Sequence, residues 1–476
     1  MIVSSRVGSQ AHSDNGLTSL VRIPLSRIFT KEARRTLVLC SGVCVYRILL
    51  DWLYFENLAP RATEYPDYRD VSLLIMSWLA VFCSLPLINK IIHGSDRDSS
   101  LTLTGLYFLS YIPFTTCIYA GMFVLPLILY GLAFWFIFFA VYCWQLETPL
   151  KPLPKITLGR IRFDDSMLKI MGVMCVFTVV YISWRYTHFR LHFSIWDVYD
   201  LRMEAREYGY PRLLSFLLQW SRKINPLMCV YYILKKNYKL AVIFFLVQIL
   251  CFGIEAHKSE LFFAFVAIAI LPVRRSTTAT QFKYIIMIGS LCLIVFAIFE
   301  IILLRSEILL QLLVRRIMFV PNSLHRYYYD YFVTLGHELT YFRNDLIYFF
   351  GKFYGVTNPY IDEVIPRIIG RIYFNSLGNN ANNGTFSQGA WELGGLGAFI
   401  IPFVLLFWLW LYDRSVEGLN SREMLGLSTT YTMQRVMMMI SGGTSLVSLD
   451  MLIIISLMSM VNRGRDYYNN TKPADT

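Results

Sequence analysis

Charged residues are scarce in this sequence, and their scarcity argues against an ordinary soluble domain. Lys, Arg, Asp and Glu make up 16% of the 476 residues, whereas soluble domains carry about 25%. Hydrophobic residues reach 56%, and Phe, Tyr and Trp alone make up 16%. A chain of this composition predicts long segments in contact with lipid, with aromatic side chains at the membrane interfaces.

Several other features are missing. The nine cysteines lie in apolar stretches and none lies in a long polar segment, so we interpret them as small buried hydrophobic residues and not as a disulfide framework. Motifs for nucleic-acid binding are also missing. The net charge of +12 therefore indicates membrane topology and anionic partners, and no nucleic acid is expected. Residues 1–35 contain no short apolar core followed by a cleavage site, so we expect a cytoplasmic tail and not a cleaved signal peptide.

Long apolar runs dominate the rest of the chain. A helix needs about 20 mostly apolar residues to cross ~30 Å of hydrocarbon, and about twelve runs approach that length. The sequence therefore predicts an all-α fold, a polytopic transmembrane helix bundle. The predicted spans begin near Thr36, Val71, Leu101, Gly121, Met167, Leu213, Leu240, Leu261, Phe282, Glu392, Met424 and Val447.

The positions of Lys and Arg predict the topology. Every short loop on the side of the N-terminal tail carries Lys or Arg, as the positive-inside rule requires. About twelve spans then place both termini in the cytoplasm and two long polar loops outside, the longer of them partly helical. The predicted parts are the tail 1–35, spans one to five in 36–184, a loop at 185–212, spans six to nine in 213–304, the large loop 305–391, spans ten to twelve in 392–462 and the tail 463–476.

The two external loops are rich in arginine. A guanidinium group binds phosphate oxygens in bidentate geometry and does not lose its proton, so an arginine cluster in a partly dehydrated groove suits a pyrophosphate. Local ion pairs with neighbouring carboxylates are the alternative interpretation for each arginine. The predicted pyrophosphate-binding residues are Arg202, Arg206, Lys258, Arg315, Arg316 and Arg326.

Aromatic and amide side chains in the large loop are candidates for binding sugars. Tyrosines stack on sugar rings, amides read sugar hydroxyls, and glycines permit a close approach of the backbone. A turn-rich loop is the alternative for the Asn-rich segment. The candidates are Tyr328, Tyr329, Asn380, Asn382 and Asn383. The external loops contain no Asp-X-Asp pair to hold a divalent ion, so no metal site is predicted.

Five charged residues interrupt the apolar runs. Arg47 and Asp51 are four residues apart in the first predicted span, so we expect them to neutralise one another. Arg222 and Lys223 in the sixth span and Glu300 late in the ninth are expected to line a water-filled cavity, because isolated charges inside a span are costly.

Short motifs on the external side add to this pattern. They are Asp197 to Gly209, His257-Lys258-Ser259, Arg315-Arg316 followed by Tyr328-Tyr329-Asp330, and Asn380 to Phe386 ahead of Gly394-Gly395-Leu396-Gly397. In their order and placement, these motifs resemble those of the bacterial oligosaccharide repeat-unit polymerases, the O-antigen polymerases of the Wzy type.

The resemblance implies a metal-independent glycosyltransferase of lipopolysaccharide biosynthesis, acting at the periplasmic face of the bacterial inner membrane without a cofactor. A growing glycan would leave undecaprenyl pyrophosphate for the non-reducing end of a new lipid-linked repeat unit. Asp330, His325 and Glu204 are the alternatives for the base that takes the proton of the acceptor hydroxyl. A chain-length regulator and a flippase are the protein partners that the resemblance implies.

Two other functions fit much of the same pattern. An O-antigen ligase, which transfers finished glycan to the lipid A core, has a similar layout and also uses loop arginines. A flippase for lipid-linked oligosaccharides has a comparable number of spans, but it should concentrate charge inside them and have short loops. The long external loop and its arginines favour an enzyme over the flippase.

Overall fold

The computed structural model describes most of the chain between residues 30 and 455. The described residues are 30–61, 64–151, 165–190, 204, 208–255, 265, 268–269, 271–273, 277–343, 357–360, 362–375, 380–417, 422–441 and 454–455. The chain forms two compact units, Met1–Cys44 and Val45–Thr476. Helix α1 (Lys31–Leu53) begins in the first unit and ends in the second.

Among the described residues, secondary structure is entirely helical, as predicted. Within the described ranges, seven helical segments are long and apolar enough to cross a membrane, as expected for a helical membrane protein. They are Glu32–Arg61, Val71–His93, Asp98–Tyr119, Leu125–Gln145, Lys169–Thr187, Ala279–Leu304 and Thr385–Val416. These segments match seven of the predicted spans.

Three further predicted spans are helical but do not meet the same criteria. Helix α9 (Tyr238–Glu255) is apolar but short, and α8 (Arg212–Leu234) and α17 (Arg422–Ser441) carry more polar residues. The predicted spans near Leu261 and Val447 lie largely outside the described residues. The prediction of about twelve spans with both termini in the cytoplasm therefore stays a prediction.

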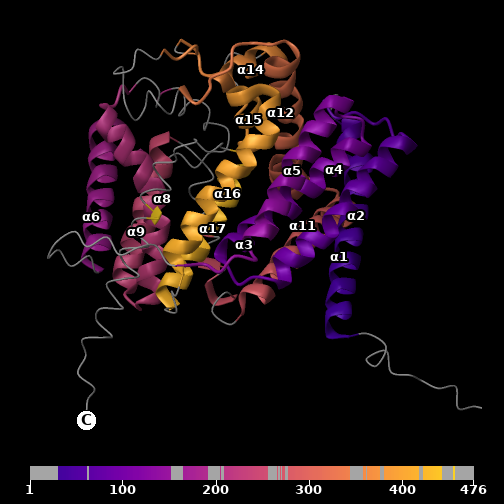
Figure 1. Cartoon of the computed structure of the whole chain (residues 1–476). Helices are drawn as coiled ribbons and strands as arrows, with labels where there is room; N and C mark the ends of the chain where they lie inside the picture. The colour runs from indigo at the N-terminus through magenta and orange to yellow at the C-terminus, as the bar shows by residue number, and fades with distance from the viewer. Residues whose placement is uncertain are drawn as a thin grey trace, which may run out of the picture. The chain divides into compact units, whose positions relative to one another are not determined.

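Helices α2 (Val71–His93), α3 (Asp98–Leu106), α4 (Ile112–Tyr119), α5 (Leu125–Gln145) and α11 (Ala279–Phe299) pack together in the second unit. Helix α6 (Asp165–Ile182) packs on α8 and α9. Figure 1 shows α16 (Gly397–Val416) and α17 between these two groups. At one end of α16, the short helices α12 (Val320–Tyr329), α14 (Ile365–Phe374) and α15 (Thr385–Leu393) gather above it.

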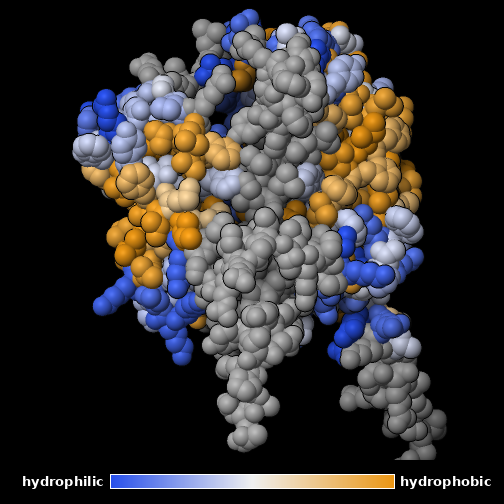
Figure 2. Space-filling model, turned by 60° about the vertical axis from the view of Figure 1, so that its left-hand side comes forward, coloured by the Kyte–Doolittle hydropathy of each residue, from blue (hydrophilic) through white to orange (hydrophobic). Residues whose placement is uncertain are grey.

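Large hydrophobic side chains lie exposed along these helices. On α2, Ile75, Leu79 and Phe82 are each at least half exposed, and α11 and α16 carry similar exposed rows. On the face drawn in Figure 2, hydrophobic residues gather at mid-height, between hydrophilic residues above and below. Burying this surface against lipid tails removes it from water, so the surface supports membrane insertion.

The first intramembrane charge pair forms as predicted. Arg47 is completely buried and makes an ion pair with Asp51. The same guanidinium donates hydrogen bonds to the Thr115 hydroxyl and carbonyl, both at 3.0 Å, and to the Ser77 hydroxyl at 3.2 Å. The ion pair therefore joins the first span to its two neighbours along the chain.

Glu300 has a structural role that the sequence did not predict. The Glu300 carboxylate accepts hydrogen bonds from the backbone amides of Ile308 and Leu309, at 3.0 and 2.8 Å. These amides begin a new helical stretch and have no partner within it. Arg305, with φ 50°, makes the left-handed turn between the two helical segments. Glu300 therefore caps a helix and sets where the next stretch starts.

Candidate functional site

A continuous helical stretch carries half of the predicted site residues. It consists of the π-helix η7 (Leu310–Phe319), α12 and the π-helix η8 (Asp330–Thr334). Pro321 lies where η7 passes into α12, and it has no N–H to donate to the preceding turn. π-Helical turns often occur at functional sites.

His325 lies in a buried hydrogen-bonded cluster with Asn383 and Ser387. Its Nδ1 is 2.8 Å from the Ser387 hydroxyl oxygen and 3.0 Å from the Asn383 amide nitrogen. The His325 ring also packs on the Phe386 ring, with 4.0 Å between the centroids. More than fifty residues of sequence separate these partners, which meet because α12 packs against α15.

Asn383 joins the other polar groups around His325. The Asn383 amide nitrogen donates to the Pro321 carbonyl at 3.1 Å, its side-chain oxygen accepts from the Gly384 amide at 2.8 Å, and the same nitrogen lies within hydrogen-bond distance of the Ser387 hydroxyl and of His325 Nδ1. The tautomer of His325 depends on which of these bonds form. In the tautomer in which Nδ1 donates to Ser387, Nε2 carries the lone pair.

Nε2 of His325 is buried and has no hydrogen-bond partner among the described residues. A buried polar atom of this kind costs about 1–3 kcal/mol, and its presence in a folded protein calls for an explanation. Burial lowers the pKa of His325 from 6.5 to about 3, because the interior disfavours the charged imidazolium. The imidazole is therefore neutral at physiological pH.

Gly384 allows α15 to begin against the end of α17. A Cβ atom on Gly384 would lie 2.1 Å from the Met439 carbonyl oxygen, so only glycine fits. The Thr385 hydroxyl also donates to this carbonyl, at 3.2 Å. The close approach at Gly384 thus positions Asn383 and Ser387 beside His325.

Replacing Gly384 should therefore destabilise the protein. The Gly384→Ala substitution forces a backbone shift in a packed interior, and such overpacking costs about 1–3 kcal/mol or more. Gly395 provides the matched control, because a Cβ atom there meets nothing within 4 Å. Thermal unfolding in detergent should show a lower midpoint for Gly384→Ala and an unchanged one for Gly395→Ala. Equal midpoints for the two variants would contradict the packing described here.

The tyrosines and the aspartate that follow His325 differ in exposure. Tyr328 is fully buried, and its hydroxyl donates to the Ala381 carbonyl at 2.8 Å. Tyr329 is also buried and packs on Tyr130. In this conformation Tyr328 has no free ring face for a sugar. Asp330 is partly exposed and accepts a hydrogen bond from the Tyr373 hydroxyl at 2.7 Å.

The predicted pyrophosphate-binding arginines of this stretch fall into two groups. Arg315 makes an ion pair with Glu64 at 2.6 Å. Burial alone would lower its pKa, but the hydrogen bonds and charge interactions with Glu64 and Tyr65 together outweigh burial, and the pKa is raised. Arg316 and Arg326 are exposed, and neither makes an ion pair or hydrogen bond among the described residues. These two guanidinium groups are therefore the ones available to an anion.

The remaining predicted site residues are less tightly placed. Asn380 and Asn382 are exposed beside buried Asn383. Glu204 accepts a hydrogen bond from the Tyr208 hydroxyl at 2.8 Å and lies 3.5 Å from the Arg190 guanidinium. Arg202, Arg206 and Lys258 lie outside the described residues.

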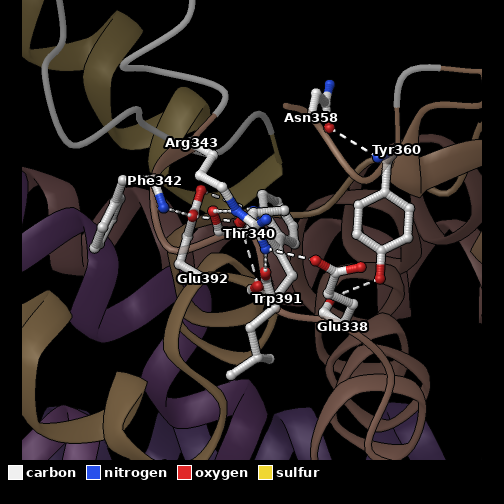
Figure 3. Close-up of polar contacts among 9 residues, drawn as sticks. Glu338, Thr340, Phe342, Arg343, Asn358, Tyr360, Trp391 and Glu392 are labelled. Atoms are coloured by element: carbon white, nitrogen blue, oxygen red, sulfur yellow. Dashed lines mark hydrogen bonds and ion pairs between the residues drawn. The ribbon is translucent and has the colours of Figure 1, made fainter. Parts of the chain in front are cut away.

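A buried carboxylate that the sequence analysis missed holds the turn after η8. Glu392 is buried and accepts hydrogen bonds from the Thr340 hydroxyl, from the Phe342 amide at 2.6 Å and from the Trp391 indole at 3.1 Å (Figure 3). Tyr341 and Phe342 both have positive φ, a conformation that such multiple bonds can sustain. Glu392 thus ties this turn to the end of α15.

The arginine of the same turn is held by its own segment. Figure 3 shows Arg343 beside Thr340 and Glu338, with an ion pair to Glu338 at 2.8 Å. Its guanidinium also donates to the carbonyls of Leu339, at 2.6 Å, and Thr340, at 3.1 Å. Tyr360 closes the turn by donating to the Glu338 carbonyl. Arg343 therefore stabilises the turn and is not free to bind an anion.

The chain was compared with protein-family models, with curated proteins and with solved structures, and none of them matches it. The function is therefore argued from the site's own geometry.

Proposed function

We propose that the chain is a glycan polymerase that joins lipid-linked repeat units at the periplasmic face of a bacterial inner membrane. The donor is a growing glycan on undecaprenyl pyrophosphate, and the acceptor is the non-reducing end of a new lipid-linked repeat unit. The observation that carries the proposal is His325, whose buried and unpartnered Nε2 is oriented by Ser387 and Asn383. A neutral imidazole oriented through Nδ1 is a common form of general base.

In the proposed reaction, the acceptor hydroxyl attacks the anomeric carbon of the donor sugar. A new carbon–oxygen bond forms while the bond from that carbon to the pyrophosphate breaks, and the pyrophosphate leaves with the electron pair. Nε2 of His325 takes the hydroxyl proton. Nε2 is covered in this conformation, so a substrate reaches it only when the side chains over it move aside.

Charge on the substrate assists the base. An imidazole with a pKa of about 3 is a weak base, because catalysis is best when the pKa lies near the working pH. A pyrophosphate bound nearby adds negative charge, which favours the imidazolium form and raises the pKa. Arg316 and Arg326, which are exposed, would hold that pyrophosphate and stabilise its departure.

Asp330 and Glu204 are the alternative bases. Asp330 directly follows α12, and its bond from Tyr373 leaves the other carboxylate oxygen available. Glu204 is held by Tyr208 and Arg190. His325 is preferred because it alone of the three combines burial, an orienting partner and an unpartnered nitrogen.

Deleting the gene in its host tests the function directly. The expected surface lipopolysaccharide is core bearing a single repeat unit, with the polymer ladder gone, because export and ligation continue without polymerisation. Bare core would contradict the proposal. In that case, long polymer stranded on its carrier outside would indicate a ligase, and single units trapped inside would indicate a flippase. An unchanged ladder would exclude all three functions for this glycan.

A further inference from the structure

A second basic site lies inside the helix bundle, on α17. Arg435 is only 4% exposed, and within the part of the chain that the structure describes its Nε and one terminal nitrogen have no hydrogen-bond partner. The guanidinium carbon lies 5.7 Å from the ring centroids of both Tyr412 and Tyr431. These contacts of about 6 Å attract a cation to the ring faces, but they leave the N–H groups unsatisfied.

Thr432 on the same helix also has an unused hydrogen-bond donor. Its side chain is buried, and its hydroxyl has no hydrogen-bond partner among the described residues. Residues three apart on a helix lie on one face, so Arg435 and Thr432 present unused donors side by side. Unused donors from a cation and a hydroxyl fit the oxygens of an anion.

Among the described residues, Arg435 makes no ion pair with a carboxylate, and a neighbouring helix adds positive charge. The Gln434 amide donates to the Lys223 carbonyl at 3.3 Å, which places α17 beside the segment of α8 that carries Arg222 and Lys223. Two acidic residues lie near Tyr412. Asp98 accepts a hydrogen bond from Ser428, and Asp413 accepts hydrogen bonds from Ser99. A buried arginine in a membrane protein normally pairs with an opposite charge or marks a ligand pathway.

We propose that Arg435 and Thr432 bind a phosphate or diphosphate group inside the helix bundle. The guanidinium supplies charged hydrogen bonds to the phosphate oxygens, and the Thr432 hydroxyl supplies one more. The anion is either the headgroup of a membrane lipid, which carries an apolar chain, or free phosphate, which carries none. This site is separate from the Arg316 and Arg326 pair, and it does not depend on the proposed glycosyl transfer.

Binding is measured on the full-length chain in neutral detergent, with no glycan present. The protein used is the Arg316→Gln, Arg326→Gln double variant, so that the site of the proposed polymerase does not contribute to binding. The probes are farnesyl diphosphate, inorganic pyrophosphate and farnesol. We expect farnesyl diphosphate to bind and farnesol not to bind. Arg435→Gln should weaken diphosphate binding by about 10- to 100-fold, because each charged hydrogen bond contributes about 1.5–3 kcal/mol.

Further comparisons distinguish a lipid from free phosphate and test whether binding is specific to the Arg435 site. Tighter binding of farnesyl diphosphate than of pyrophosphate supports a lipid, and equal binding supports free phosphate. Arg69, an exposed cation paired with Asp67, is the control, and Arg69→Gln should leave binding unchanged. If Arg435→Gln fails to fold, Thr432→Val should still weaken binding several-fold. The proposal would be overturned if the double variant bound no diphosphate. It would also be overturned if Arg69→Gln lost as much binding as Arg435→Gln.

Discussion

The His325→Ala variant should lose polymerisation by at least about 100-fold, because a positioned general base contributes about 10²–10⁴-fold. Removing the imidazole removes Nε2 while leaving Arg316 and Arg326 in place. The substrate would bind, but the acceptor hydroxyl would keep its proton. Variants expressed in the deletion strain should give core with a single repeat unit, and a gel of the lipopolysaccharide measures the loss of the ladder.

His337→Ala is the matched control. His337 lies on the same polar segment, and its ring stacks on the Tyr331 ring, with 3.8 Å between the centroids. It should give a full ladder at equal protein levels in the membrane. If His325→Ala also gives a full ladder while Asp330→Asn loses it, the base is Asp330 and the role of His325 is wrong.

Replacing Asp51 with alanine should cost about 3–5 kcal/mol of unfolding free energy, the usual cost of leaving a buried charge without its partner. Arg47 has no exposed surface and only neutral partners besides Asp51. Its guanidinium would remain charged in the middle of a span, where charge is expensive. Thermal or denaturant-induced unfolding of the purified protein in detergent measures the loss.

The exposed ion pair of Asp67 with Arg69 serves as the comparison. Its atoms lie 2.7 Å apart, yet both side chains are more than a third exposed. Pairs of this kind contribute about 0–1 kcal/mol, so Asp67→Ala should scarcely change stability. Similar losses in Asp51→Ala and Asp67→Ala would mean that the Arg47 pair is not buried as described.

The sequence by itself predicted the features that depend on neighbours along the chain. Apolar runs of about 20 residues predict spanning helices, and seven of the predicted spans correspond to helices that meet the length and composition of a span. The spacing of Arg47 and Asp51 predicted their ion pair, because residues four apart meet on one face of a helix. Helix α17 does not meet these criteria, because several polar residues, Arg435 among them, lie buried where it packs against α8 and α3.

Only the tertiary structure decided which polar residues meet. His325 and Ser387 are 62 residues apart, and their contact depends on how α12 packs against α15. The same packing buries Tyr328, and an ion pair with Glu64, 251 residues away, occupies Arg315. Helical periodicity reports which residues share a face of one helix, but it contains no information on which faces of distant helices meet. The site therefore required the fold, whereas the membrane class required only the sequence.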